Sequence, residues 1–373
     1  MSQLMKVVTV EFDNALQVTW PNGETSEFSF LWLRDNARDP ESFDSRSHQR
    51  EVFTANIDPD IKPQRIELSQ AGEAILVWWH EGDSEISYPA EFLYRYRVPV
   101  NHTSAFPKQV YWDAEYDIAP LQYSNLINEG QTQPLLSQLA TYGFALVQGC
   151  PCESDSVNQL ASLLGYIRTT IFGGLWTFEA DETMADSAYT SHDLRPHTDG
   201  SYSLDAPGVQ ILLCIDQEAT GGDSVMVDGF NVADEIRRTA PSVFKSLCEI
   251  DVEGLYQGDG VKLLASRPVI RLNKAGEFEQ ITFNNYDRNT MTLPKDEMAR
   301  LYEAIQLIDN QFNSPARQWR HQLKAGEALV FDNWRLLHGR TAYSGKRKIS
   351  GCYINREDLV SQYYAHFDGS DRG

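Results

Sequence analysis

Two histidines and one aspartate give this chain a set of side chains that can hold a metal ion. His197 and Asp199 lie two positions apart, and His338 follows far downstream. Alternate residues of an extended strand point to the same face, so His197 and Asp199 can approach one ion together. Two imidazoles and one carboxylate leave coordination positions open, as in non-haem Fe(II) sites that bind a co-substrate and O2. The pattern predicts an iron-dependent oxygenase.

An arginine and a serine extend this set toward an organic acid. Arg347 lies nine residues beyond His338, and Ser224 ends a Thr-Gly-Gly-Asp-Ser motif. A co-substrate that chelates iron through a keto acid needs a cation for its second carboxylate, which arginine binds through two parallel hydrogen bonds. A serine hydroxyl can donate one more. Each residue alone is more often structural, and a lone arginine commonly forms a surface ion pair. Their combined order favours a binding site.

Short apolar segments separated by turn residues must position these groups. The pattern predicts strands over residues 143–147, 209–215, 224–227, 269–272, 280–283, 328–331 and 349–353. Helices are predicted near residues 135–140, over 157–164 and over 295–312, where Met298, Leu301, Tyr302, Ile305, Ile308 and Phe312 form one apolar stripe. Many short strands that carry a metal triad indicate a mostly β fold with flanking helices, either a sandwich or a jelly roll.

Residues 1–100 are predicted to form a smaller β-rich domain. Alternating residues indicate strands at 7–12 and 15–20. Residues 16–34 resemble residues 75–97, which predicts two related hairpin-plus-helix halves. The matching positions are Trp20 with Trp79, Gly23 with Gly82, and Leu31 and Leu33 with Phe92 and Tyr94. Residues 101–130 lack a clear period and are predicted to link this domain to a catalytic domain over 131–373.

The composition narrows the classes of partner and compartment. A net charge of −21 disfavours nucleic acid and anionic membrane surfaces, although local arginines can still bind a small anion. Five thinly spread cysteines are typical of a reduced protein without a disulfide framework. No run approaches the roughly 20 apolar residues of a spanning helix. The first residues lack the pattern of a targeting peptide. We therefore expect a cytoplasmic enzyme.

Nearly the whole chain resembles one enzyme family. The motifs are WLRDNA and SHQR in the first domain, and HTD, TGGDS, VDGFN, FNNYDR, FDNWRLLHGR and GCY in the second. They are similar to those of the 2-oxoglutarate/Fe(II) dioxygenases of the taurine-dioxygenase-like superfamily. The resemblance is greatest to the γ-butyrobetaine and trimethyllysine hydroxylase branch, which includes bacterial enzymes acting on 2-(trimethylammonio)ethylphosphonate. It implies a distorted double-stranded β-helix and a homodimer. It also implies Fe(II) bound by His197, Asp199 and His338, and 2-oxoglutarate held by Arg347 and Ser224.

The resemblance further implies a pocket for a trimethylammonium zwitterion. An aromatic cage suits a quaternary ammonium, because that group has no N–H to donate and is bound by ring faces instead. The rings implied are Phe172, Trp176, Tyr189 and Tyr353. Core packing is the plain alternative for these rings. Donors for the anionic end of the substrate are Tyr202, Asn284, Asn285 and Arg288.

Two features depart from the branch, and a third, Asp186, departs from its γ-butyrobetaine hydroxylases but is matched by an acidic residue in its trimethyllysine hydroxylases. Relatives place a zinc-binding cysteine cluster after WLRDN, whereas no cysteine here precedes Cys150, so we expect no zinc. Phe172 stands where γ-butyrobetaine hydroxylases have tyrosine, and Asp186 stands where they have a carboxylate-binding asparagine. The Asp186 carboxylate would repel a simple carboxylate, but it suits an α-ammonium or a phosphonate hydroxyl. Trimethyllysine and 2-(trimethylammonio)ethylphosphonate therefore rank equally, ahead of γ-butyrobetaine.

Two other functions fit parts of the pattern. A related dioxygenase would act on a sulfonate or another small acid without a quaternary ammonium, but Trp176, Tyr189 and Tyr353 argue against it. A non-catalytic β-sandwich binding protein would have lost at least one metal-binding residue or the arginine, and none is missing from the sequence. The preferred prediction is a dioxygenase that hydroxylates a C–H bond.

Overall fold

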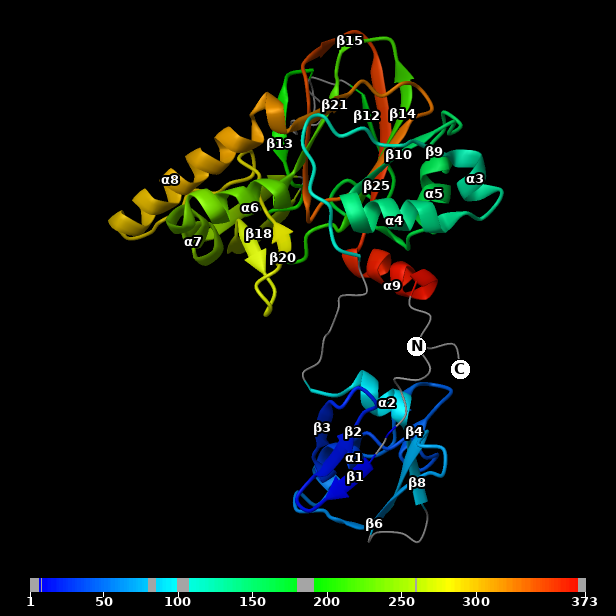
Figure 1. The fold of residues 1–373 in the computed structure, drawn as a ribbon. Coiled ribbons are helices and arrows are strands. Elements are labelled where there is room, and N and C mark those ends of the chain that lie inside the picture. Colours follow the sequence, from blue (N-terminus) through cyan, green and yellow to red (C-terminus); the bar gives the residue numbers. More distant parts are fainter. Residues whose placement is uncertain are drawn as a thin grey trace. The chain divides into compact units, whose positions relative to one another are not determined.

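The computed structural model describes residues 7, 9–79, 85–98, 107–179, 191–258 and 260–367. The chain divides into two compact units, residues 1–103 and 104–373 (Figure 1). Each unit has its own hydrophobic core.

The smaller unit contains one motif twice, a three-stranded antiparallel sheet followed by a short helix. The first copy contains β1 (Thr9–Phe12), β2 (Leu16–Thr19), β3 (Thr25–Phe28) and α1 (Phe30–Asp35). The second contains β6 (Pro63–Leu68), β7 (Ala74–Trp79), β8 (Glu85–Pro89) and α2 (Ala90–Arg95). Between the copies lie β4 (Phe43–Asp44), β5 (Gln49–Arg50) and the 3-10 turn η2 (Thr54–Asn56).

The predicted repeat is confirmed, with one correction in its register. Trp20 and Trp79 are both buried, as their matching places in the repeat imply. In the two helices the corresponding buried residues are Leu33 and Leu93. Tyr94 therefore does not match Leu33, because a short helix buries only the side chains that share one face.

The larger unit is a distorted double-stranded β-helix, or jelly roll, as the sequence predicts. Its seven-stranded sheet contains, in order, β11 (Ile167–Arg168), β25 (Arg347–Ile354), β14 (Val209–Gln217), β22 (Ala328–Asp332), β10 (Phe144–Gln148) and β9 (Leu121–Gln122), with β12 (Trp176–Glu179) paired to β25. Its four-stranded sheet contains β13 (Leu194–His197), β23 (Leu336–Arg340), β16 (Ser224–Asp228) and β21 (Gln318–His321).

Helices cover the outside of this sandwich (Figure 1). The helices α4 (Thr132–Tyr142), α5 (Asp155–Ser162) and α9 (Arg356–Phe367) share a core with the seven-stranded sheet. A second core joins α6 (Gly229–Thr239), α7 (Pro241–Glu249) and α8 (Lys295–Phe312) to β19 (Ile270–Leu272) and β20 (Phe278–Ile281). The remaining elements are α3 (Tyr123–Ile127), β15 (Thr220–Gly221) with β24 (Tyr343–Ser344), β17 (Asp251–Gly258) with β18 (Val261–Pro268), and η4 (Pro315–Arg317).

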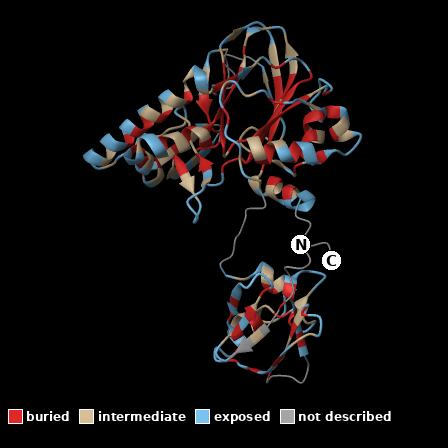
Figure 2. Ribbon diagram, in the orientation of Figure 1, coloured by how far each residue is buried: buried red, intermediate tan, exposed pale blue. Residues whose placement is uncertain are grey.

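Strand β14 shows how the seven-stranded sheet separates a core from a cavity. Val209, Ile211 and Leu213 are fully buried in the core shared with the helices. Gln210 and Leu212 point to the other face and line a cavity between the sheets. This alternation follows from the two-residue period of a strand. Buried residues accordingly concentrate on the strands of the sandwich (Figure 2).

The predicted strands and the long helix are present, with shifts at some ends. Helix α8 has the predicted bounds, 295–312. Strand β20 ends at Ile281 rather than at Phe283. The reason is that Phe283 leaves the β19–β20 ladder, and its N–H donates to Thr198 Oγ1 (2.9 Å).

Residues 107–130, which the sequence predicts as part of a linker, belong to the larger unit. Trp112 and Ile118 are buried in a core that also contains Phe144. The Trp112 indole donates to the Tyr142 carbonyl (2.7 Å). An extended segment held by single anchors has no hydrophobic period, which explains why the sequence pattern misses it. Among the described helices, none has both the length and the apolar content needed to cross a bilayer.

Candidate active site

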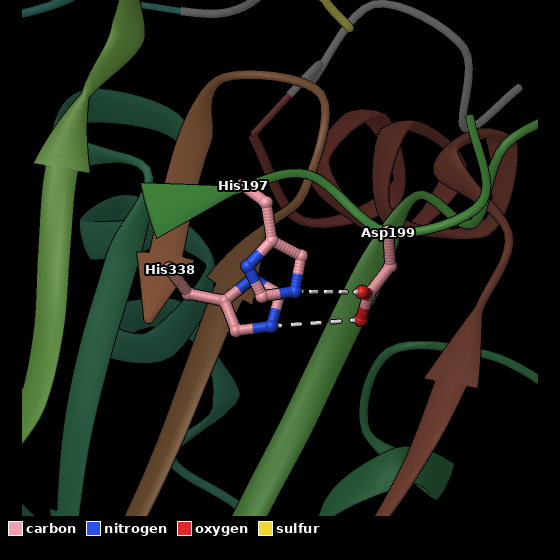
Figure 3. Close-up of side chains that lie close together, drawn as sticks. All are labelled: His197, Asp199 and His338. Atoms are coloured by element: carbon pink, nitrogen blue, oxygen red, sulfur yellow. Dashed lines mark ion pairs between the residues drawn. The ribbon is translucent and has the colours of Figure 1, made fainter. Parts of the chain in front are cut away.

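His197, Asp199 and His338 converge between the two sheets (Figure 3). Nε2 of His197 lies 3.3 Å from Oδ1 of Asp199, and Nε2 of His338 lies 3.6 Å from Oδ2. The three ligand atoms lie within 4.8 Å of one another. The sequence predicts His197 and Asp199 on one strand, but the observed strand is shorter. β13 ends at His197, and Asp199 reaches the site from the bend that follows.

The protonation of these groups suits a metal cation. The Nδ1 of His197 is placed to donate to the Arg195 carbonyl (2.9 Å), which leaves its Nε2 lone pair facing Asp199. Burial lowers the pKa of His338 to about 4, so this imidazole is neutral, as a metal ligand must be. Burial raises the pKa of Asp199, but His338, His197 and the Tyr353 hydroxyl outweigh it and hold that pKa well below its usual range.

A proton and a metal compete for the remaining imidazole. Burial lowers the pKa of His197, but the hydrogen bond with Asp199 outweighs it and raises the net pKa. The two imidazoles and the Asp199 carboxylate would hold Fe(II) once His197 is neutral, because a metal ligand must have lost its proton.

Two buried side chains hold Asp199 in place. The Asn333 amide, in the turn between β22 and β23, accepts from the Asp199 N–H (2.8 Å) and donates to the Asp199 carbonyl (3.0 Å). The Tyr353 hydroxyl donates to Asp199 Oδ2 (2.8 Å). His338 lies on β23, the strand that follows Asn333. The hydrogen bonds of Asn333 therefore connect the β22–β23 hairpin, which carries His338, to the bend that contains Asp199.

A glycine lets the two histidine strands approach each other. A Cβ atom at Gly339 would lie 2.4 Å from the Leu194 carbonyl oxygen, so only glycine fits where β13 pairs with β23. His197 and His338 are opposite each other in that pair, and their ring centroids are 4.4 Å apart. Gly339 therefore contributes to the site indirectly, because it lets the backbones of β13 and β23 pair closely and brings the two histidines together.

Two arginines and a serine lie farther along the same sheets. Arg340 follows His338 by two residues on β23, and its Cα is paired with that of Ser224 on β16. Arg347 begins β25 on the facing sheet. Burial lowers the pKa of both guanidinium groups, and the charge of Arg340 lowers that of Arg347 further. Within the described residues no salt bridge reaches Arg347. Arg340 is buried and Arg347 half-buried, and two like charges in such surroundings would be stabilised by an anion.

These groups line one cavity of about 940 Å³, its opening to solvent included. Six of the predicted ligand-binding residues line it together with the metal triad. They are Phe172, Tyr202, Ser224, Asn284, Arg347 and Tyr353. Two further predicted residues, Asp186 and Tyr189, lie outside the described residues.

The sequence matches one enzyme family over most of this unit. Residues 103–353 match the taurine catabolism dioxygenase TauD, TfdA family. The chain belongs to the TauD/TfdA family. It is a 2-oxoglutarate-dependent non-haem iron dioxygenase that uses Fe(II), 2-oxoglutarate and O2, and the donor set of the triad fits this metal. Residues 9–94 match the γ-butyrobetaine hydroxylase-like N-terminal family.

Several dioxygenases are similar to this chain over most of their length. A trimethyllysine dioxygenase of Meyerozyma guilliermondii is 30% identical, over 96% of this chain and 95% of the relative. The mitochondrial trimethyllysine dioxygenase of Homo sapiens is 31% identical, over 90% and 81%. A γ-butyrobetaine dioxygenase of Pseudomonas is 28% identical, over 94% and 93%.

A solved structure supports the TauD-like fold. It is a putative α-ketoglutarate-dependent taurine dioxygenase from Burkholderia xenovorans, with a TM-score of 0.51 and 14% sequence identity. The match covers 66% of this chain and 91% of the other.

In this TauD/TfdA family member, aromatic rings continue from the cavity into the core. The ring centroids of Phe172 and Phe178 are 5.9 Å apart, Phe178 stacks on Trp176 at 4.5 Å, and Trp176 lies 5.5 Å from Tyr353. Phe178 lines the cavity, whereas Trp176 is only 4% exposed and lies behind it. A Cβ at Gly351 would lie 2.3 Å from the Trp176 ring, so the glycine of the GCY motif makes room for the indole.

The structure does not bring Asn285 and Arg288 into this cavity. They line a smaller neighbouring pocket, and the Arg288 guanidinium lies over the Tyr302 ring, 5.9 Å from its centroid. The Asp287 side chain lines the cavity instead. The Asn284 amide donates to Asp287 Oδ2 (2.7 Å), so it holds a turn rather than offering its N–H to an anion. In such an irregular segment, sequence spacing does not predict where neighbouring side chains point.

Among the cavity residues that were not predicted as ligand-binding are Phe178, Gln210, Asp287 and Arg340. Strand alternation was an available signal for two of them, since Phe178 follows Trp176 by two positions and Arg340 follows His338 likewise. Gln210 is a polar residue inside the apolar run 209–215. For Asp287 the irregular segment provides no such signal.

Proposed function

We propose that this dioxygenase hydroxylates a C–H bond of a small trimethylammonium zwitterion. Trimethyllysine is the best-supported substrate, 2-(trimethylammonio)ethylphosphonate comes next, and γ-butyrobetaine comes last. The observation that carries the proposal is the series of aromatic rings in the cavity that also holds the His197–Asp199–His338 triad. The trimethyllysine dioxygenases among its relatives support the same substrate class.

In this proposal His197, Asp199 and His338 hold Fe(II), while Arg347 and Ser224 hold the distal carboxylate of 2-oxoglutarate. When bound, Fe(II), 2-oxoglutarate and O2 supply the oxidation of the C–H bond. The protein selects the carbon by holding the substrate at a fixed position, not by the weakness of the bond. We expect a middle carbon between the two ends of the substrate to be hydroxylated.

The rings bind the trimethylammonium end. Phe172, Phe178 and Tyr353 line the cavity, and Trp176 supports Phe178 from behind by stacking. Each ring face contributes about 0.5–2 kcal/mol to binding a cation without N–H groups. We include Tyr189 as a further ring of this cage, on its place in the sequence.

Carboxylates distinguish between the candidate substrates at the other end. Asp287 lines the cavity, and Asp186 is a second acidic residue assigned to this end by its place in the sequence. Arg288, the predicted partner of an anion, lines other pockets. A substrate whose far end is a simple carboxylate would be repelled, whereas trimethyllysine presents an α-ammonium that can pair with Asp287. Its α-carboxylate can accept from the Tyr202 hydroxyl.

A substrate panel tests the proposal. Succinate release by the enzyme with Fe(II), 2-oxoglutarate and O2 should be fastest with trimethyllysine, and mass spectrometry should show addition of one oxygen. Dimethyllysine and lysine should be slower by about 10-fold or more, because an N–H group loses its hydration without finding an acceptor among rings. Equal rates for lysine and trimethyllysine would contradict the cage. Succinate release driven by sulfonates alone would favour the alternative of a non-quaternary small acid.

Asp287→Asn should change kcat/KM for trimethyllysine and for γ-butyrobetaine in opposite directions. The variant should lose about 10-fold or more in kcat/KM for trimethyllysine, since a hydrogen-bonded charge partner contributes about 1.5–3 kcal/mol. It should keep or improve turnover of γ-butyrobetaine, because repulsion is removed. Arg288→Ala is the comparison, and it should leave both substrates nearly unchanged. If Arg288→Ala were the damaging change, the anionic end would be held by that arginine and the assignment to Asp287 would fail.

A further inference from the structure

A buried glutamine that has no side-chain hydrogen bond to any described residue lines the cavity. Gln210 on β14 is 2% exposed, and its Oε1 has no donor among the described residues. The strand around it is apolar, and its neighbours Val209 and Ile211 belong to the core beneath the helices. Leaving a buried polar atom unpaired destabilises a folded protein. An apolar residue of similar size would remove this cost, so the amide needs another explanation.

The register of β14 places this amide beside the metal end of the cavity. The Cα of Gln210 is paired with that of Tyr353 on β25 and with that of Phe331 on β22. The Tyr353 hydroxyl donates to Asp199, and the Phe331 ring centroid lies 5.0 Å from that of His338. Gln210 therefore lies between two residues that each touch the metal triad.

The apolar middle of the cavity separates this amide from the arginines. Leu212 follows Gln210 on the cavity face of β14, and Leu329 and Ile349 line the cavity on the adjoining strands. The anion site of Arg347 and Arg340 lies at the far end of these residues. A dicarboxylate placed over them would have one carboxylate at the arginines and the other near Gln210.

We propose that Gln210 is a binding residue for 2-oxoglutarate, and that its amide N–H donates to the carboxylate of the keto-acid end. A primary amide carries two donors and an acceptor, and rotation about its terminal bond exchanges their places, so a donor can be turned to the ligand. The unpaired amide is thus tolerated because the co-substrate completes its hydrogen bonds. This inference concerns the co-substrate and is independent of which trimethylammonium compound is hydroxylated.

Gln210→Leu and Gln210→Met test this role without requiring turnover. In oxygen-free solution, 2-oxoglutarate is titrated into the Fe(II)-loaded protein, and the charge-transfer absorption of the chelate gives its Kd. Both variants should raise this Kd by about 10-fold or more, as expected for losing a hydrogen bond to a charged group. The Kd for Fe(II) should stay within about twofold. The Tm of the metal-free protein should rise by a few degrees, because the unpaired polar atom is gone.

Gln318→Leu is the matched control. Gln318 is buried on β21, where it donates to the Phe312 carbonyl (3.1 Å) and accepts from Arg320 (2.6 Å). Its replacement should lower the Tm and leave the Kd for 2-oxoglutarate unchanged. An unchanged Kd for 2-oxoglutarate in both Gln210 variants would overturn the proposal, whatever happens to the Tm. If the Gln210 variants lost affinity for trimethyllysine alone, the proposal would also be wrong, because the amide would then bind the substrate rather than 2-oxoglutarate.

Discussion

Asp199→Ala should abolish Fe(II) binding and turnover together. Its carboxylate is the common partner of both imidazoles, at 3.3 Å from His197 and 3.6 Å from His338. Removing an outer partner of a metal ligand already costs about 10–100-fold in metal affinity or activity. Loss of a ligand itself should exceed about 100-fold in both. The measurements are the Kd for Fe(II) from an anaerobic titration and succinate release under saturating 2-oxoglutarate.

Asp296→Ala controls for the loss of a carboxylate as such. Asp296 is exposed in the first turn of α8, so its replacement should leave metal affinity and turnover nearly unchanged. His197→Ala and His338→Ala should resemble Asp199→Ala, because each imidazole would supply one nitrogen to the same ion. Near-normal turnover by the Asp199 variant would show that another group completes the metal site, and the assignment of the triad would then be wrong.

Arg347→Ala should weaken the binding of 2-oxoglutarate while leaving the Fe(II) content of the protein near normal. The guanidinium lies in the cavity with the triad, and within the described residues no salt bridge neutralises it. Losing one partner of a buried charge pair costs about 2–5 kcal/mol, which corresponds to at least an order of magnitude in affinity. Arg347→Lys should recover only part of the loss, since an ammonium cannot make two parallel hydrogen bonds to a carboxylate.

Lys348→Ala is a control on the neighbouring position of the same strand. Because alternate residues of β25 point to opposite faces, Lys348 points away from the face of Arg347 and should be replaceable without effect on 2-oxoglutarate. The measurement is the Kd for 2-oxoglutarate with the trimethylammonium substrate absent. If Arg347→Ala bound 2-oxoglutarate as tightly as the parent enzyme, Arg340 would be the cation that holds its distal carboxylate.

Periodic parts of the chain could be predicted well from the sequence. The apolar residues over 295–312 recur with the period of a helix, and α8 spans those residues. The strands at 209–215 and 328–331 were recognised by their apolar runs, because a strand buried on both faces needs such a run. The segment 107–130 has neither period, and its place in the larger unit could not be predicted from local pattern.

Family membership and the iron and 2-oxoglutarate chemistry follow from the matched residues 103–353. The homodimer, the cytoplasmic location and the lack of a zinc ion stay predictions from the sequence. The roles given to individual ligand-binding residues are proposals, and the variants described above test them.

By itself, the sequence determined the metal chemistry and the fold class. Residue type and strand alternation are local properties, and they were enough to select His197, Asp199, His338 and Arg347. Tertiary structure alone decided which neighbours of these residues face the ligand. It placed Asp287 in the cavity and Arg288 outside it, and it set Gln210 between Tyr353 and Phe331. The reason is physical: the direction of a side chain outside regular structure, and the presence of a hydrogen-bond partner for a buried one, depend on segments far apart in the chain.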